Sequence, residues 1–143
     1  MKINLDTFLP YQLNNLATLV SNDFATLYQQ QFGLNIPQWR VLANLAQFGQ
    51  STAKDLCRQA NMDKSTVSRA LKALLERQLI SSEINPQDKR AALLMLNEQG
   101  QQLYADIAKQ ALEWEQQLLS ALSRDEYSTL MRCFDKLTVK LQQ

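Results

Sequence analysis

The chain contains a helical segment with two distinct faces at residues 63–78, DKSTVSRALKALLERQ. Successive helical residues are rotated by about 100°, so side chains three and four positions apart share a face. The apolar side chains fall on one face, which carries Val67, Ala70, Leu71, Leu74 and Leu75. Hydroxyls and long charged side chains fall on the opposite face, which carries Ser65, Arg69, Lys72 and Glu76. Taken alone, this pattern is also typical of an ordinary solvated surface helix.

The residues before this segment predict a second, shorter helix and a tight turn. Thr52 and Asp55 have the spacing of a capping box, in which the hydroxyl and the carboxylate each accept a free backbone N–H. This spacing predicts a helix from there to about residue 59, followed by a turn at residues 61–62. Asp63 is then the predicted N-cap of the two-faced helix. We therefore expect residues 52–78 to form a helix-turn-helix.

The residues after the two-faced helix predict a β-hairpin. Residues 79–84 and 92–96 have the length of strands, and they flank the turn-rich loop 85–90, NPQDKR. A basic loop of this kind can place a cation in a minor groove, although an ordinary soluble turn is the alternative. Asp88 would repel phosphate, so we expect it to hold a nearby cation, either Arg90 or one on the two-faced helix.

The order of these elements favours DNA binding. A capped short helix, a turn, the two-faced helix and a basic-tipped hairpin are arranged as in a winged helix-turn-helix, whose second helix enters the major groove. Short hydroxyls there can reach base edges, arginine can bind guanine bidentately, and cations can meet phosphates. The predicted DNA-contacting residues are Lys64, Ser65, Thr66, Ser68, Arg69, Lys72, Lys89 and Arg90. Residues 51–91 carry a net charge of +3 on a chain whose total is +1, which agrees weakly with this prediction.

The two ends of the chain predict long amphipathic helices. Residues 5–31 form the first, which Gly33 ends, and residues 98–141 form a pair joined at a capping box of Ser123 and Glu126. Between them, a helix with Pro37 in its first turn runs to about residue 48. The terminal helices carry more apolar surface than one small lobe can bury, so we expect a second chain to cover it; packing within the chain is the alternative. The residues concerned are Leu9, Leu13, Leu16, Leu118, Leu122, Leu130, Phe134 and Leu137.

The hairpin and the helix after it resemble the MarR (multiple antibiotic resistance regulator) family. That family's pattern is D-x-R, three residues, L-x-L-T, two residues and G, and residues 88–100 here read DKRAALLMLNEQG. Asn97 replaces the usual threonine, and both residues cap helices. Residues 38–42 and 63–69 resemble the family's second helix and recognition helix, so the likeness covers nearly the whole chain. The matching positions are Asp88, Arg90, Leu94, Leu96 and Gly100.

This resemblance implies a single MarR-type domain over residues 1–143, mainly α-helical with a small β-hairpin wing. A winged helix-turn-helix lobe would span residues 34–97, with the wing at about 79–96. Residues 5–31 and 98–141 would form the dimerisation helices. The implied protein is a homodimer on a pseudo-palindromic operator in double-stranded DNA, with half-sites about 10 bp apart or a multiple of that. The resemblance further implies a repressor that a small, often aromatic, ligand releases.

Sensing residues are less clearly marked than DNA-contacting ones. Tyr11, Trp39, Arg40 and Phe48 could line a ligand pocket, or they could be core aromatics and their neighbours. Cys57 and Cys133 are expected to be free thiols that pack as small residues. A redox-responsive regulator that uses one of these thiols is an alternative function.

Other classes of protein are disfavoured by missing residues. The chain has no histidine and no Cys-x-x-Cys pair, so we expect no metal site. It has no nucleotide-binding or nucleophile motif, so we expect neither an enzyme nor a cofactor. No long apolar run or signal peptide is present, which predicts a cytoplasmic protein without a membrane partner. A helical interaction or adaptor protein that does not bind DNA remains the second alternative.

Overall fold

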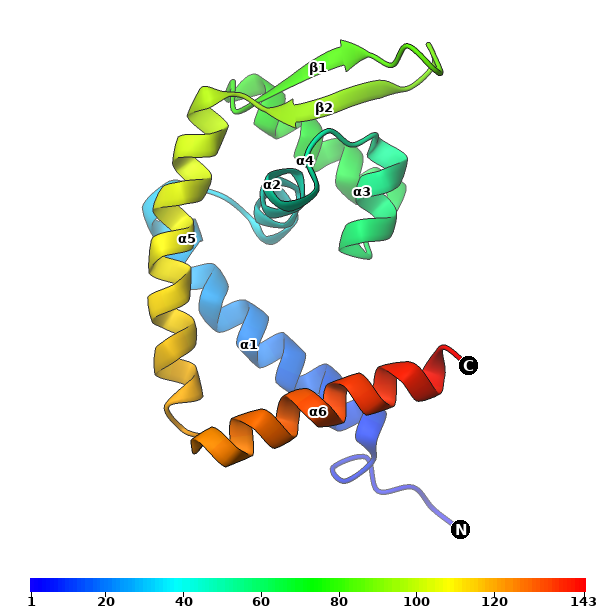
Figure 1. The fold of residues 1–143 in the computed structure, drawn as a ribbon, viewed down its shortest axis with the longest axis vertical. Coiled ribbons are helices and arrows are strands. Elements are labelled where there is room, and N and C mark those ends of the chain that lie inside the picture. Colours follow the sequence, from blue (N-terminus) through cyan, green and yellow to red (C-terminus); the bar gives the residue numbers. More distant parts are fainter. The chain divides into compact units, whose positions relative to one another are not determined.

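The computed structural model describes residues 1–143 as six helices and one antiparallel hairpin (Figure 1). The chain divides into two compact units, Met1–Ile107 and Ala108–Gln143, and the division falls within one helix. The mainly α-helical fold with a hairpin wing, predicted from the sequence, is confirmed. No helix combines the length and the apolar character that a membrane span requires. The elements are α1 (Leu9–Phe32), α2 (Ile36–Phe48), α3 (Ala53–Ala60), α4 (Lys64–Glu76), β1 (Ile80–Ile84), β2 (Ala92–Leu96), α5 (Glu98–Leu119) and α6 (Arg124–Leu141).

The first helix begins later than predicted. It was expected from residue 5, but α1 starts at Leu9, with Pro10 in its first turn. A helix that began at residue 5 would place Pro10 in its interior, where proline removes a hydrogen bond and clashes with the preceding turn. The predicted end is confirmed, because Gly33 has a left-handed backbone (φ 66°) and its N–H bonds to the carbonyl of Gln29.

The predicted helix starts in the middle of the chain are confirmed. In α3 the Asp55 N–H donates to Thr52 Oγ1 at 3.1 Å, and the Thr52 N–H donates to Asp55 Oδ2 at 3.0 Å. Asp63 caps α4 by accepting the Thr66 N–H. The end of α4 comes slightly earlier than residue 78, because Gln78 has a left-handed backbone (φ 60°) that turns the chain into β1.

The wing is a two-stranded sheet with one additional bridge. Ile80 pairs with Leu96 and Ile84 pairs with Ala92, which sets the register that the sequence left open. Ser51, just before α3, exchanges two backbone hydrogen bonds with Leu94, at 3.1 and 2.8 Å. This bridge ties the wing to the connection between α2 and α3.

The hydrophobic core lies within Met1–Ile107. The α4 residues Val67, Ala70, Leu71 and Leu74 are buried in it, as their shared face predicts. Leu75 was placed on the same face, but it is 40% exposed because it lies at the edge of the apolar stripe. The other buried apolar residues are Ala25, Tyr28, Leu34, Val41, Leu42, Leu45, Leu56, Leu79, Ile80, Leu94 and Ile107.

The second unit contains the end of α5 and all of α6. The predicted capping box opens α6, with the Ser123 N–H donating to Glu126 Oε1 at 2.9 Å and the Glu126 N–H donating to Ser123 Oγ at 3.1 Å. None of the residues of α6 is buried. The expectation that Cys133 is packed is therefore wrong, because its helix buries no side chain within the chain, whereas Cys57 is half-buried. Both thiols are free, as expected.

Candidate nucleic-acid interface

The first turn of α4 is organised by the Asp63 carboxylate. Its Oδ1 accepts the Thr66 backbone N–H at 2.7 Å and the Ser65 hydroxyl at 3.0 Å. The Thr66 backbone N–H, helped by the hydroxyls of Thr66 and Ser65, holds the pKa of Asp63 below its ordinary value. Asp63 is therefore ionised at neutral pH, and an ionised carboxylate can only accept hydrogen bonds. The Ser65 hydroxyl must donate to it, which leaves the oxygen lone pairs of Ser65 available to another donor.

The polar face of α4 is open to solvent. Lys64, Ser65, Ser68, Arg69 and Lys72 are exposed, and Thr66 is half-buried. One guanidinium nitrogen of Arg69 lies 3.5 Å from Thr66 Oγ1, at the outer limit of a hydrogen bond. The guanidinium therefore retains most of its donors for a ligand. The structure thus brings the six predicted α4 residues together on an accessible surface.

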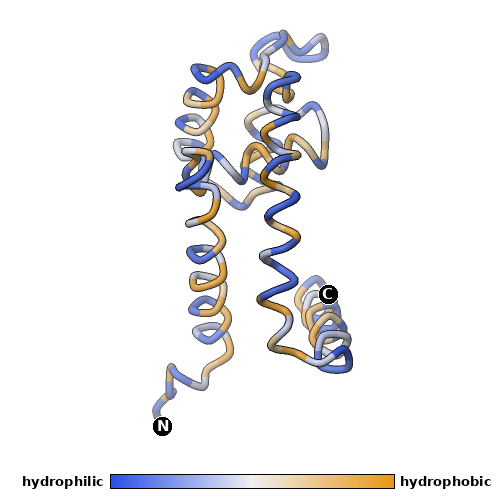
Figure 2. Tube along the Cα trace, turned by 90° about the vertical axis from the view of Figure 1, so that its left-hand side faces the viewer, coloured by the Kyte–Doolittle hydropathy of each residue, from blue (hydrophilic) through white to orange (hydrophobic).

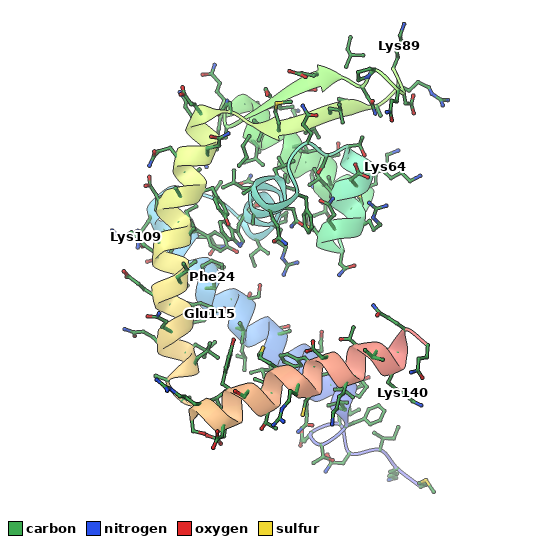
Figure 3. All side chains as sticks on the ribbon, viewed as in Figure 1. Phe24, Lys64, Lys89, Lys109, Glu115 and Lys140 are labelled. Carbon is green, nitrogen blue, oxygen red and sulfur yellow. The ribbon has the colours of Figure 1, made fainter.

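The tip of the wing carries a paired and an unpaired cation. Arg90 donates from both its backbone N–H and its Nε to Asp88 Oδ1, at 3.0 and 3.3 Å. Of the two cations that Asp88 was expected to hold, Arg90 is therefore the one that it contacts. The Arg90 side chain is 93% exposed, so this contact orients the guanidinium without burying it. Figure 3 shows Lys89 at this tip and Lys64 at the start of α4 on the same side of the structure, both directed outward.

A groove of about 540 Å³ lies between α3, α4 and the wing. Leu71 and Leu75 of α4 line it, and Asp88 and Arg90 line it from the wing. Lys54, in the first turn of α3, also lines this groove and is exposed. Sequence reasoning did not select Lys54 as a site residue. Its place directly after a capped helix start was the available signal, since helix N-termini commonly face phosphates.

The four candidate ligand-pocket residues lie in different surroundings. Trp39 stacks between Tyr28 and Tyr104, with ring centroids 5.5 and 6.0 Å away. Burial raises the pKa of Tyr28 above its ordinary value, and the charge of Arg40 partly opposes this shift. One guanidinium nitrogen of Arg40 lies 3.4 Å from the Ser21 hydroxyl of α1. Trp39 and Arg40 thus both lie against α1.

The other two candidate ligand residues are exposed. Tyr11 lies near the start of α1 beside Phe8, with ring centroids 6.3 Å apart, and Phe48 is the last residue of α2. Neither belongs to the aromatic cluster around Trp39. The four residues therefore do not line one common pocket within the chain. The structure contains no cluster of three or more cysteine or carboxylate side chains arranged to hold a metal ion.

The fold and this surface define a winged helix-turn-helix DNA-binding protein. A model of the MarR family matches residues 32–91. The uncharacterized HTH-type transcriptional regulator YwoH of Bacillus subtilis is 32% identical over 130 residues, which cover 88% of this chain and 93% of YwoH. A MarR/EmrR family transcriptional regulator from Acinetobacter sp. ADP1 is also 32% identical. The structural match to its crystal structure covers 99% of each chain, with a TM-score of 0.85.

A more distant solved structure has the same fold. BpsR of Bordetella bronchiseptica, whose DNA binding is regulated by 6-hydroxynicotinic acid, is 22% identical, with a TM-score of 0.74. The matched region covers 89% of this chain and 98% of BpsR. The matches to YwoH and to the Acinetobacter regulator show that the chain belongs to the MarR family of transcriptional regulators. It is a DNA-binding regulator of the winged helix-turn-helix type.

Proposed function

We propose that this MarR-family regulator binds a pseudo-palindromic operator as a homodimer, with α4 in the major groove and the tip of the β1–β2 hairpin in the minor groove. The observation that carries the proposal is the exposed face of hydroxyls and cations on α4, whose first turn Asp63 organises. An N-terminal turn of this kind meets base edges when a recognition helix enters the groove.

Base readout falls to Ser65 and Arg69. Because Ser65 already donates to Asp63, its oxygen would act as an acceptor, which suits the amino group of adenine or cytosine. Arg69 has the free fork of donors that binds O6 and N7 of guanine. These two side chains would therefore carry most of the sequence preference of one half-site.

Phosphate binding falls to the surrounding side chains. Lys64, Thr66, Ser68 and Lys72 flank the two base-reading residues on α4, and we add Lys54 on the far side of the groove. In the wing, Arg90 would enter the minor groove with Asp88 fixing its orientation, and Lys89 would meet the adjacent backbone.

The regions outside the winged lobe, residues 34–97, would hold the dimer and the effector. Residues 5–31 and 98–141 are the proposed dimerisation helices, supported by their exposed apolar side chains. The regulation of BpsR by an aromatic acid supports a similar small effector for this chain. The effector would bind near Trp39 and Arg40. Its binding would release the regulator from the operator and so relieve repression. We place this activity in the cytoplasm, where the chromosome lies, and assign the chain no catalytic role.

Two protein variants test the proposal. Genomic footprinting of the purified protein first defines the operator, and the binding of each variant to that operator is then compared with the wild type. Arg69→Ala should change sequence preference, because the lost contact is to a base. Lys72→Ala should weaken binding to all sequences alike and lower the slope of log affinity against log salt by about one. Titrations on the operator, on half-site variants and on random duplex measure both effects. Equal losses on every sequence for Arg69→Ala would contradict base readout, and a wild type without a preferred sequence would contradict the proposed function.

A further inference from the structure

The three residues that join α4 to the wing, Arg77–Leu79, form a junction with contacts on two sides. On one side, the Arg77 guanidinium reaches the end of α1. Its Nη1 donates to the Gly33 carbonyl at 3.2 Å, and its Nη2 donates to the Phe32 carbonyl at 3.0 Å. The last turn of α1 contains no basic residue, so a side chain 44 residues further along supplies a cation to its negative end.

On the other side, the start of α5 packs directly onto the junction. The Asn97 side chain donates from Nδ2 to the Gln78 carbonyl at 2.7 Å, and the Asn97 backbone N–H donates to the Leu79 carbonyl at 3.2 Å. Asn97 also caps α5 by accepting the Gly100 N–H at 2.9 Å. A Cβ at Gly100 would lie only 2.0 Å from the Leu79 carbonyl oxygen, so only glycine permits this approach. The ends of two long helices therefore meet at the same three residues.

The junction separates the two DNA-contacting elements, because α4 ends at Glu76 and β1 begins at Ile80. We propose that Arg77 is a positioning residue for operator binding: by joining the junction to the end of α1, it sets the orientation of α4 and the wing relative to α1. This inference rests on the proposed DNA interface and dimer. In a dimer, such a link fixes the distance between two recognition helices, and therefore the spacing of half-sites that the protein accepts.

The chemistry of the contact requires arginine. A guanidinium presents donors in a planar fork that can meet two neighbouring carbonyl oxygens at once, whereas a lysine ammonium is a point charge on a flexible stem. The competing role for an exposed cation in this lobe is a phosphate contact, and lysine serves that role well. Arg77→Lys therefore separates the two roles, because it keeps the charge and removes the fork.

The experiment measures binding of Arg77→Lys and Arg77→Gln to operator duplexes, with the wild type as the reference. We expect both Arg77 variants to bind the operator about tenfold more weakly, at an unchanged salt slope. We also expect them to lose less affinity than the wild type when one base pair is inserted between the half-sites. Wild-type affinity and spacing preference in Arg77→Lys would overturn the inference. A salt slope that falls by about one only in Arg77→Gln would also overturn it, in favour of a phosphate contact.

Hydrogen exchange of the free protein separates this inference from the proposed function. The Gln78 and Leu79 amides bond back to α4, and the Leu34 amide bonds to Tyr28 at the end of α1. If Arg77 holds these segments together, Arg77→Lys should speed exchange at all three amides relative to the wild type. Unchanged exchange would overturn the inference even if operator binding is confirmed. A wild type that binds no duplex would instead contradict the proposed function, and faster exchange would still support the link.

Discussion

The winged lobe and the terminal helices are both built from amphipathic helices, but the lobe covers far more of its apolar side chains within the chain. Four of the thirteen residues of α4 are buried, whereas none of the eighteen residues of α6 is. Figure 2 shows hydrophobic positions recurring along α1 toward its N-terminal end, where Leu9, Leu13 and Leu16 are exposed. Helical periodicity therefore predicts which face is apolar, but it does not reveal whether the same chain covers that face.

Within α1 the same contrast occurs along a single helix. Ala25 and Tyr28, in its C-terminal third, are almost fully buried, whereas Leu16 is 59% exposed. An uncovered apolar stripe of this length marks an interaction surface in a folded protein. A second copy of the chain is the partner that we propose for it. The lobe should then be stable through contacts within the chain, and the terminal helices through contacts between chains.

The largest predicted effect is on folding, at the contact between the lobe and the start of α5. Gly100→Ala should lower the free energy of unfolding by about 3 kcal/mol, because the new Cβ would collide with the Leu79 carbonyl oxygen. Helix propensity alone predicts the opposite sign, since alanine is the better helix former. Urea unfolding followed by circular dichroism measures the change, and Gln101→Ala, one residue further along, should stay within about 0.5 kcal/mol of the wild type. An equally stable Gly100→Ala would show that α5 does not need this close approach.

The next effect separates the two regions. Leu13→Glu should weaken dimerisation by at least about 30-fold, because it places a charge in the proposed interface. The lobe should remain folded, since Leu13 is exposed within the chain. Sedimentation across a range of concentrations measures the dimer, and thermal unfolding at low concentration measures the lobe. Gln12→Glu adds the same charge at the neighbouring position as a control. A dimer of wild-type strength in Leu13→Glu would remove α1 from the interface.

Sequence reasoning succeeded where a structure depends on neighbouring residues. The capping boxes at Thr52 and Ser123, the αL residue Gly33 and the hairpin around residues 85–90 all follow from spacings of a few positions. The similar box of Asn35 and Gln38 at the start of α2 was missed, although its spacing is the same. The late start of α1 could also have been found, because Pro10 excludes a longer helix.

Contacts between distant residues were not predictable in this way. The family pattern marks Gly100, but only the structure shows that the Leu79 carbonyl makes a side chain impossible there. The Arg77 contact with the end of α1 spans 44 residues and has no local sequence signal. The same limit applies to the ligand residues, because their aromatic character does not show that Trp39 is packed while Phe48 is exposed. Of the candidate DNA site, the accessibility of the α4 face was predictable, and the groove that adds Lys54 was not.

A smaller effect is expected at the wing, and it acts on binding rather than on folding. Arg90→Ala should weaken operator binding by about 1–3 kcal/mol, because the guanidinium would lose its groove contact. Asp88→Asn should weaken it less, since the amide oxygen can still accept from the Arg90 backbone N–H. Titrations of both variants on the operator measure these losses, and Lys2→Ala provides a control for removing a cation outside the lobe. Unchanged affinity in Arg90→Ala would remove the wing from the interface.

The smallest predicted effect concerns the charge on Asp63. Its folded-state pKa is lowered, chiefly by the Thr66 backbone N–H, so ionised Asp63 stabilises the folded lobe. This contribution is complete above the ordinary aspartate pKa of about 4, and it is lost as the pH falls through the lower folded-state value. Asp63→Asn keeps an acceptor at the cap and removes the charge. Its urea midpoint should therefore be slightly below that of the wild type from pH 7 to pH 5, and the gap should close below about pH 4.

Comparing Asp63→Asn with the wild type at each pH isolates this single group, because the other titrating carboxylates are common to both proteins. Glu126→Gln is the matched variant on α6, since the Ser123 backbone N–H lowers the pKa of Glu126 in the same way. If the terminal helices hold the dimer together, the difference in urea midpoint between Glu126→Gln and the wild type should depend on protein concentration. The reason is that unfolding of α6 is then coupled to dissociation of the dimer. The difference in urea midpoint between Asp63→Asn and the wild type should depend less on protein concentration if the lobe unfolds separately.

If the difference in urea midpoint between Asp63→Asn and the wild type does not change with pH, the negative charge of Asp63 does not stabilise the folded lobe. An equal concentration dependence for both variants would show that the lobe and the terminal helices unfold as one unit.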